Sequence, residues 1–260
     1  MTKGARLGQH FLTARWAAVS LARAAHIEEK EAVLEVGPGK GALTRELLAT
    51  QGTVYAIEKD EALVEKLHVT FASEIQTQRL HVITADIRGF DPATIGLEDK
   101  KYVVAANIPY YITGEIIRHF LTAAVQPRAM AILIQKEVAQ RITSSKGSIL
   151  SISVKAYGTP RIVEKVSRKC FSPAPSVDSA ILTIENISRD FFSEMSEEHF
   201  FDVVRAGFAS KRKFLVNNLG VRFGKEEALQ ALLACGMNEK IRAEEVDLGK
   251  WKSLALRLHI

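Results

Sequence analysis

The chain has 260 residues, 47% of them hydrophobic, and its basic residues outnumber its acidic ones by 35 to 30. This length allows one large domain, or a main domain with a smaller appendage. No apolar run reaches the roughly 18 residues of a membrane span, and the basic start lacks the apolar core of a signal peptide. Cys170 and Cys235 are too few and too isolated for a disulfide framework or a zinc cluster. We therefore expect a cytoplasmic protein that has no metal site and does not bind membranes.

Short apolar runs alternate with helical patterns through the first two thirds of the chain. Five runs have the length of buried strands, at 32–36, 53–57, 80–84, 102–106 and 129–134. Amphipathic patterns between them predict helices at 41–50, 60–73 and 114–125. This alternation predicts a mostly parallel, doubly wound α/β sheet of the Rossmann-like type.

The pattern changes after the fifth run. Further strands are predicted around a proline-rich stretch at 171–178, namely at 149–154, 161–166 and 180–184. Beyond residue 188 the chain is typical of helices, at 196–208, 211–219, 226–235 and 248–258. The sequence therefore predicts two domains, an α/β domain over 1–187 and a small helical domain over 188–260.

A glycine-rich turn, Gly37-Pro38-Gly39-Lys40-Gly41, follows the first predicted strand. Glycines at this junction let a ligand approach the backbone, and the next helix offers free N–H groups. Glu58 ends the second strand about 20 residues later, where a carboxylate can accept hydrogen bonds from ribose hydroxyls. Asp86 follows the third strand and could accept the exocyclic amine of an adenine. Each acid alone could equally cap a helix, but together with the turn they predict an adenosine-containing cofactor.

The segment Asn107-Ile108-Pro109-Tyr110-Tyr111 follows the fourth strand, at the sheet edge where open α/β folds bind ligands. An ordinary strand-to-helix turn would also explain its Asn and Pro. The amide and the aromatic pair, however, suit a flat ring that forms hydrogen bonds. Two classes of enzyme compete here, a nicotinamide dehydrogenase and a methyltransferase that uses S-adenosylmethionine. No proton-relay Tyr, Lys or His stands out, so the segment favours the methyltransferase.

This segment resembles the (N/D/S)-(I/L/P)-P-(Y/F/W) motif of methyltransferases that act on the amino group of adenine. Four more segments extend the resemblance, at 8–12, 35–44, 135–141 and 171–180. Together they occur in the order found in ribosomal RNA adenine N6,N6-dimethyltransferases, and the chain is similar to that family from about residue 8 to 180. The resemblance implies S-adenosyl-L-methionine as the cofactor and ribosomal RNA as the partner.

Two C-terminal segments, 208–219 and 241–246, are similar to the small-subunit branch of this family. That branch dimethylates two adjacent adenines in the 3′-terminal hairpin loop of 16S rRNA during ribosome assembly. The resemblance therefore implies immature small subunits as the partner, and we expect a monomer. Three alternatives remain: a 23S rRNA methyltransferase of the macrolide-resistance type, a DNA adenine methyltransferase, and a non-catalytic RNA-binding assembly or transcription factor. The intact glycine turn argues against the last of these.

The resemblance also implies roles at the target base. Asn107 and the carbonyl of Ile108 would accept hydrogen bonds from the N6 amine, and Pro109 would fix the turn. Tyr110 and Phe171 would stack on the two faces of an unpaired adenine. The alternative for Phe171 is a loop anchor buried in the core.

For the cofactor, the resemblance implies contacts from His10, Leu12, Gly37, Gly39, Glu58, Asp86 and Asn107. The glycines would lie along the methionine part, and His10 and Leu12 would close the pocket. Residue 10 departs from the family, which usually has Asn there, although imidazole can also donate or accept a hydrogen bond.

Three segments are rich in basic residues and poor in acids, at 1–27, 155–169 and 203–225. They favour a polyanion-binding face, although separate solvated surfaces would give the same pattern. The predicted RNA contacts come from the third segment: Arg205, Lys211, Arg212 and Lys213. A second departure, the missing tyrosine of the family's Y-G-x-L-S motif, leaves the role of the loop at 144–151 open.

Overall fold

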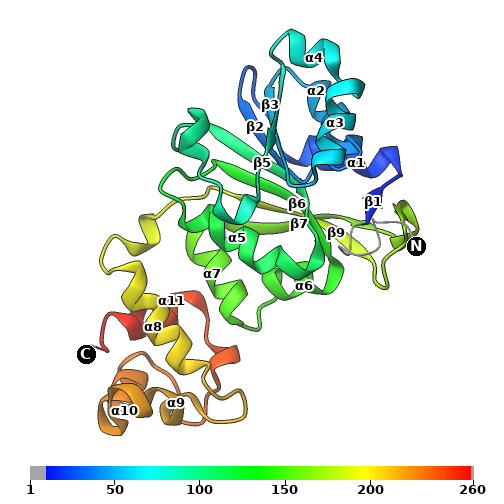
Figure 1. The fold of residues 1–260 in the computed structure, drawn as a ribbon. Helices are drawn as coiled ribbons and strands as arrows, with labels where there is room; N and C mark the ends of the chain where they lie inside the picture. Colours follow the sequence, from blue (N-terminus) through cyan, green and yellow to red (C-terminus); the bar gives the residue numbers. More distant parts are fainter. Residues whose placement is uncertain (1–9, 259–260) are drawn as a thin grey trace. The chain divides into compact units, whose positions relative to one another are not determined.

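A computed structural model describes residues 10–258, which form two compact units (Figure 1). Unit 1 comprises the described residues up to Ala139 together with Thr159–Ile187. Unit 2 comprises Gln140–Gly158 and the described residues from Ser188 onward. A boundary between the units lies after Ile187, and the segment 140–158 belongs with the C-terminal helices. The catalytic and RNA-binding roles expected for the two domains stay predictions. The predictions for residues 1–9, including the first two residues of the motif at 8–12, lie outside the described part.

Unit 1 is built on a seven-stranded sheet with the strand order β4-β3-β2-β5-β6-β9-β7. Five parallel strands form its larger part: β2 (Ala32–Val36), β3 (Thr53–Glu58), β4 (Leu80–Thr84), β5 (Tyr102–Asn107) and β6 (Ala129–Gln135). The sheet ends with β9 (Ser179–Glu185), antiparallel to β6, and β7 (Thr159–Val166), antiparallel to β9. The predicted α/β fold is confirmed.

Helices cover both faces of this sheet because its central strands are apolar on both sides. One face packs against α1 (Arg15–Ala24), α2 (Ala42–Leu48) and α3 (Glu61–Thr70), through residues such as Val33, Val54 and Ala105. The short α4 (Ala72–Gln76) follows α3. The opposite face carries α5 (Thr113–Thr122), whose Ile116, Ile117 and Phe120 are buried (Figure 1). The carboxyl ends of the parallel strands are thereby left free to form a site.

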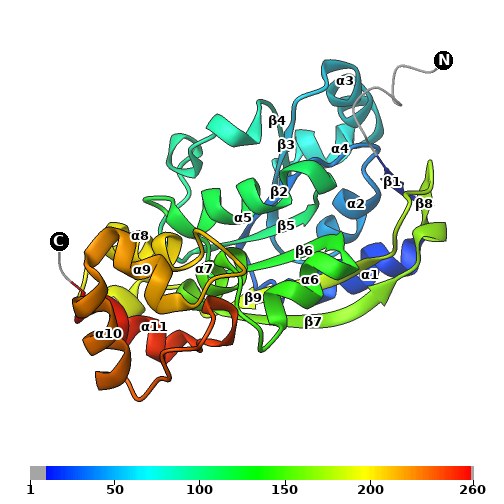
Figure 2. The same ribbon diagram turned by 90° about the horizontal axis from the view of Figure 1, so that it is seen from below.

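A second, two-stranded sheet brings the N-terminal segment beside the proline-rich loop (Figure 2). Its strands, β1 (Phe11–Leu12) and β8 (Phe171–Ser172), are antiparallel, with Leu12 opposite Phe171. Thr13 N donates to Cys170 O at 2.8 Å and extends this pairing. Two segments about 160 positions apart in the chain thus meet at one edge of unit 1.

Unit 2 is helical, and α6 (Lys136–Thr143) leads into it. Its helices are α7 (Ile149–Tyr157), α8 (Glu197–Gly207), α9 (Leu215–Phe223), α10 (Lys225–Ala234) and α11 (Leu248–Ala255). Phe200, Leu219 and Trp251 are fully buried in its core. The helices predicted at 196–208, 226–235 and 248–258 are confirmed to within a few residues.

The strand predicted at 149–154 is wrong, because this segment forms α7. Its alternating apolar residues fit either period, and the preceding residues decide the outcome. Ser148 Oγ accepts from Ser151 N at 3.1 Å, and Ser151 Oγ accepts from Ser148 N at 2.8 Å. This reciprocal capping box satisfies the free N–H groups of a helix start.

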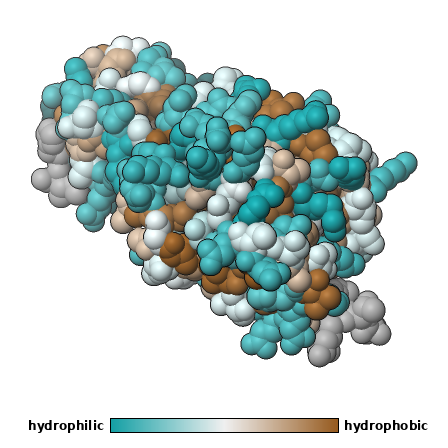
Figure 3. Space-filling view, turned by 90° about the horizontal axis from the view of Figure 1, so that it is seen from above, coloured by the Kyte–Doolittle hydropathy of each residue, from teal (hydrophilic) through white to brown (hydrophobic). Residues whose placement is uncertain are grey.

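The surface is mixed in character. Apolar residues appear as separate patches among hydrophilic ones (Figure 3), and large exposed apolar side chains such as Val69 and Val221 belong to different helices. Within residues 10–258, no helix combines the length and the apolarity needed to cross a bilayer.

Candidate functional site

The glycine-rich turn between β2 and α2 is open on one side. Gly37, Gly39 and Gly41 have φ angles of 67°, 58° and 80°, which other residues rarely adopt. A Cβ on Gly39 would lie 3.2 Å from the Phe11 ring, and one on Gly41 would lie 2.4 Å from the Phe71 ring. A Cβ on Gly37 would meet nothing within 4 Å. Gly37 therefore faces open space, where a ligand can reach the backbone.

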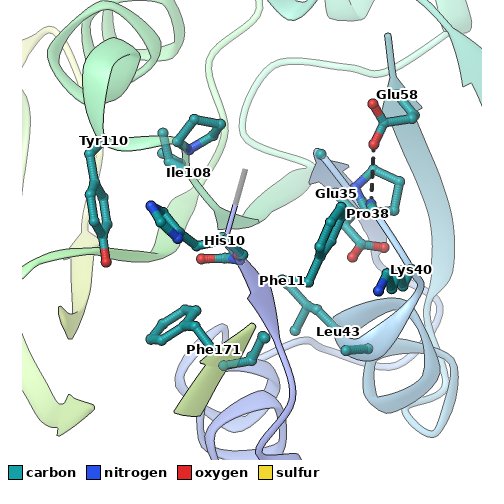
Figure 4. Close-up of a pocket in the computed structure, with 16 residues that line it drawn as sticks. His10, Phe11, Glu35, Pro38, Lys40, Leu43, Glu58, Ile108, Tyr110 and Phe171 are labelled. Atoms are coloured by element: carbon teal, nitrogen blue, oxygen red, sulfur yellow. Dashed lines mark hydrogen bonds between the residues drawn. The ribbon is translucent and has the colours of Figure 1, made fainter. Parts of the chain in front are cut away.

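Glu58, at the end of β3, is only 6% exposed and binds backbone N–H groups of two turns. Its Oε2 accepts from Gly39 N at 3.1 Å (Figure 4), and its Oε1 accepts from Lys59 N at 2.8 Å and Asp60 N at 3.0 Å. A carboxylate offers about four lone-pair sites. The bonds therefore fix its orientation and leave one acceptor site, on Oε2.

Asp86, just beyond β4, binds two cations. Its Oδ2 accepts from Lys59 Nζ at 2.8 Å and Arg88 Nη2 at 2.6 Å, and its Oδ1 accepts from Arg88 N at 3.1 Å and Arg88 Nε at 3.0 Å. Arg88, and next to it Lys59, hold the pKa of this carboxyl well below its usual range. All four of its lone-pair sites are in use. Asp86 nevertheless lines the same hollow of about 280 Å³ as Glu58 and Gly37.

The segment after β5 supplies an amide and an aromatic ring. Asn107 Nδ2 donates to His10 O at 3.2 Å, which leaves the amide oxygen as the acceptor at this position. Ile108 N donates to Leu133 O at 3.2 Å, and Pro109 has φ −56° and ψ 132°, which turns the chain away from the sheet. The hydroxyls of Tyr110 and Ser179 lie 2.8 Å apart, and burial raises the pKa of Tyr110. This residue therefore stays protonated, with its ring held in place.

Three rings, those of Tyr110, His10 and Phe171, lie around one space (Figure 4). The centroids of the His10 and Tyr110 rings are 5.7 Å apart, with an interplanar angle of 31°. Phe171 is 5% exposed and belongs both to the hydrophobic core and to the wall of the hollow. His10 Nδ1 lies 2.8 Å from Pro173 O. Because a carbonyl oxygen can only accept, Nδ1 carries a proton and donates it to Pro173 O.

The structure brings the residues predicted in unit 1 to one place. Two hollows, of about 110 and 280 Å³, adjoin because they share Gly37, Glu58 and Pro109. Every predicted cofactor or base contact lines one or both: His10, Leu12, Gly37, Gly39, Glu58, Asp86, Asn107, Ile108, Pro109, Tyr110 and Phe171. Their roles toward a ligand stay predictions.

Glu35 is a site residue that the sequence reasoning missed. It lies in β2, is 1% exposed, and lines the hollow beside Gly37. Within residues 10–258 neither of its carboxylate oxygens has a hydrogen-bond partner. Burial raises the pKa of this carboxyl to about 8, and the neighbouring Thr44 lowers the pKa by a smaller amount. An acid in a buried strand just before a glycine turn was the available signal.

The predicted RNA-binding residues belong to unit 2, and they differ in their partners. Lys211, Arg212 and Lys213 are exposed and precede α9, which begins at Leu215, so the helix predicted from residue 211 starts later. Within the described residues no acid pairs with any of the three. Arg205 instead forms an ion pair with Asp202 at 2.7 Å. The three unpaired cations are therefore the better candidates for phosphate contacts.

The sequence matches the family model described as ribosomal RNA adenine dimethylase over residues 2–259. The chain belongs to this family. The dimethylase is 39% identical to ribosomal RNA small subunit methyltransferase A of Dehalococcoides mccartyi (strain CBDB1), over 96% of this chain and 86% of that protein. It is 36% identical to the protein of the same name from Thermosynechococcus vestitus, over 96% of this chain and 94% of that one. The family resemblance found in the motifs is confirmed.

Two solved structures resemble the dimethylase over nearly its whole length. The 23S rRNA methyltransferase ErmE is 26% identical with a TM-score of 0.78, covering 95% of this chain and 99% of its own. A dimethyladenosine transferase from Plasmodium falciparum is 25% identical with a TM-score of 0.79, covering 94% and 96%. The dimethylase is thus a methyltransferase that uses S-adenosyl-L-methionine.

The residues of the site fit this cofactor. Its methionine part carries a sulfonium and an ammonium, and the unpartnered carboxylate of Glu35 beside the open face of Gly37 suits a cation. Its adenosine part offers hydroxyl and amine donors, for which Glu58 and Asp86 line the larger hollow. The bound cofactor supplies the electrophilic methyl group, and the protein supplies orientation and electrostatics.

Proposed function

We propose that this dimethylase methylates the N6 amines of two adjacent adenines in the 3′-terminal hairpin loop of 16S rRNA during small-subunit assembly. The observation that carries the proposal is the position of Asn107. It lines the hollow that contains Gly37 and Glu58, and this hollow is also bounded by the rings of Tyr110 and Phe171. The names of the curated relatives support the small subunit as the substrate.

The adenine N6 amine is a poor nucleophile because its lone pair is delocalised into the ring. Before the first transfer the Asn107 oxygen and the Ile108 carbonyl accept its two N–H groups and favour a pyramidal nitrogen. The amine releases one proton to water for each methyl group it gains, so one N–H remains for the second transfer. The Asn107 amide is fixed in advance, since its Nδ2 is bound to His10 O, and the backbone leading into Ile108 is held by the bond from Ile108 N to Leu133 O. No strong base is needed, because the methyl donor is already an excellent electrophile. Positioning and preorganised dipoles lower the barrier.

The target adenine stacks on Tyr110, and its opposite face meets Phe171. The bond between Tyr110 and Ser179 prevents the first ring from turning. Because Phe171 is 5% exposed, only a small part of its ring is available to the base. Tyr110 therefore provides most of the stacking energy, on the order of 1–3 kcal/mol per base.

Gly37 and Gly39 would hold the methionine part of the cofactor, and Asp86 would hold its adenine. Glu58 accepts one ribose hydroxyl through the free site on Oε2. Asp86 can accept the adenine amine only after Lys59 or Arg88 gives up a hydrogen bond, because its lone pairs are all engaged. His10 and Leu12 close the pocket.

Phosphate groups of the RNA bind Lys211, Arg212 and Lys213, with a smaller contribution from Arg205. The enzyme acts in the cytoplasm as a monomer, which size-exclusion chromatography coupled to light scattering would check. A second subunit in solution would contradict that part of the proposal.

The proposal is tested by methyl transfer from labelled cofactor to unmethylated small-subunit particles, with large-subunit RNA and duplex DNA as parallel substrates. Dimethyladenosine at two adjacent positions of 16S rRNA is expected. Label in the large subunit alone would favour the 23S alternative, and label in DNA a DNA methyltransferase. Calorimetry that detects no cofactor binding would instead favour a non-catalytic RNA-binding protein.

A further inference from the structure

Unit 2 contains a hollow of which the proposed function uses a single lining residue, Lys211. Its volume is about 700 Å³, and its walls come from three stretches that are far apart in the sequence, at 140–150, 208–211 and 243–244. Sites for small organic ligands have volumes of about 300–1,000 Å³. The hollow is therefore large enough for a nucleotide.

Hydrogen bonds hold the wall around residue 147 in place. Gly147 N donates to Glu244 O at 2.7 Å, and Lys155 Nζ donates to Ser144 O at 2.5 Å. A Cβ on Gly147 would lie 3.5 Å from the Glu244 carbonyl oxygen, so the two turns are closely packed. The capping box of Ser148 fixes the next residues. A ligand thus meets a formed wall, which reduces the entropy lost on binding.

The cations around this hollow lack acidic partners. In the described part of the chain, Arg141, Lys146 and Lys211 line it and form no ion pair. Four other cations of unit 2 form ion pairs: Arg189 with Glu197 (2.6 Å), Arg205 and Arg222 with Asp202 (2.7 Å each) and Lys252 with Glu194 (2.7 Å). Glu244 also lines the hollow. The three basic side chains outnumber this acid, so the hollow has a net positive charge. This arrangement favours an anionic ligand.

An aromatic ring and aliphatic side chains complete the wall. Phe208 is half-buried and its ring stacks on Trp251, with centroids 5.6 Å apart and an interplanar angle of 23°. Trp251 is fully buried, so the Phe208 ring rests on the core of unit 2. Ile149 is 43% exposed at the same hollow. Proteins that bind single-stranded nucleic acid combine cations, which contact the phosphates, with aromatic rings, which stack on the bases. This hollow has both.

We propose that this hollow binds one nucleotide of the ribosomal RNA outside the two target adenines. Its phosphate contacts Arg141, Lys146 and Lys211, and its base lies against Phe208. This inference rests on the proposed function, which supplies RNA as the ligand. The hollow is a second point of attachment, so it contributes to RNA affinity and leaves cofactor binding unchanged.

The charge part of the proposal is tested with Arg141→Gln, Lys146→Gln and Lys211→Gln, one at a time. Lys240→Gln is the matched control, because Lys240 is an exposed cation of unit 2 that does not line the hollow. Losing one phosphate contact weakens binding to unmethylated particles about 5- to 8-fold near 0.1 M salt, and lowers the salt slope by about 0.7–0.9. Slopes that match the control for all three variants would overturn the proposal.

The stacking part is tested with Phe208→Leu, which keeps an apolar side chain on Trp251. Affinity should fall about 5-fold or more with an unchanged salt slope, because stacking releases no counterions. Thermal unfolding establishes that the variant is folded. A folded variant with unaltered affinity would contradict a base against Phe208.

A photoreactive p-benzoylphenylalanine at Ile149 locates the ligand directly. The control position is Leu233, which is 58% exposed on α10 and does not line the hollow. A cross-link to rRNA from position 149 and none from 233 supports the site, whereas a cross-link from 149 to a ribosomal protein alone overturns it. Methyl transfer by the unaltered enzyme reports separately on the proposed function. Normal transfer together with unchanged slopes would therefore refute only the hollow.

Discussion

Charged groups are arranged differently around the site in unit 1 and around the hollow in unit 2. In unit 1, Glu58 accepts three backbone N–H groups and Asp86 is bound by two cations. In unit 2, Arg141, Lys146 and Lys211 have no ion-pair partner in the described residues. Fixed acceptors select a small ligand by its shape and donor pattern, whereas free cations attract a polyanion over a distance. Under the proposed function, unit 1 would therefore provide ligand specificity and unit 2 RNA affinity.

The largest expected effect comes from breaking the fixed acceptors of unit 1. Asn107→Ala removes the amide oxygen and its anchor on His10 O. We expect the single-turnover rate of methyl transfer to fall about 10²–10³-fold, as when one preorganised group is lost from other active sites. RNA affinity should stay nearly constant, and Asn217→Ala, an exposed amide of unit 2, serves as the control. A large loss of RNA binding by Asn107→Ala would mean that the side chain holds RNA and has no part in transfer.

A smaller effect is expected at Glu35, the unpartnered carboxyl of unit 1. Glu35→Gln preserves the shape but cannot become an anion, so cofactor affinity should fall about 10- to 100-fold, the range for a hydrogen bond to a charged group. Because burial raises the Glu35 pKa to about 8, affinity of the unaltered enzyme should rise between pH 6.5 and 8. Calorimetry with S-adenosyl-L-methionine measures both effects. A flat pH profile would show that the ionised form is not used.

The same group links stability to pH. Its pKa is higher in the folded state, about 8 against about 4.5, so the folded state binds the proton more tightly. Its contribution to stability is fully present below pH 4.5 and is lost as the pH rises to about 8. The ligand-free enzyme should therefore lose more stability over this range than Glu35→Gln, as urea titrations at pH 5 and 8 would measure. Equal losses would place the titration elsewhere.

Paired and unpaired cations of unit 2 give the next comparison. Arg212→Gln should weaken RNA binding about 5- to 8-fold near 0.1 M salt, because Arg212 is free to release a counterion on contact with a phosphate. Arg205→Gln should have a smaller effect, since Asp202, which Arg205 shares with Arg222, partly offsets the charge of that guanidinium at 2.7 Å. Binding curves at several salt concentrations measure both slopes. Equal slopes would show that ion pairing does not decide which cations bind RNA.

Most of the site in unit 1 could be predicted from the sequence because its polar residues lie at the ends of strands. Gly37, Glu58 and Asn107 each lie at or just after the end of a parallel strand, so the topology alone brings them together. The β1–β8 pairing, which brings His10 beside Tyr110, depends on contacts between distant segments and left no periodic signal. His10 replaces the family's usual Asn and still donates, through Nδ1, to Pro173 O.

Unit 2 was harder to predict for two physical reasons. The run at 149–154 fits strand and helix periods alike, and the capping box of Ser148 stabilises the start of the helix. Arg141 and Lys211 are 70 positions apart, so their convergence on one hollow could not be inferred from local charge density. Whether a cation is free to bind phosphate also depends on its ion pairs. The pair of Arg222 with Asp202, for example, joins residues 20 positions apart in the sequence.

The smallest expected effect tests how fully the acceptors of unit 1 are occupied. All lone pairs of Asp86 are engaged, so the adenine amine must displace a bond from Lys59 or Arg88. Lys59→Met removes one of the donors that compete with the adenine amine for Asp86. It should tighten S-adenosylhomocysteine binding about 2- to 5-fold, which lies within the net free energy of one hydrogen bond. S-inosylhomocysteine, in which the adenine is replaced by hypoxanthine, lacks the amine donor. Its affinity should not change, which makes it the matched control. If both ligands bind more tightly by the same factor, Lys59 acts by general charge repulsion and Asp86 does not recognise the amine.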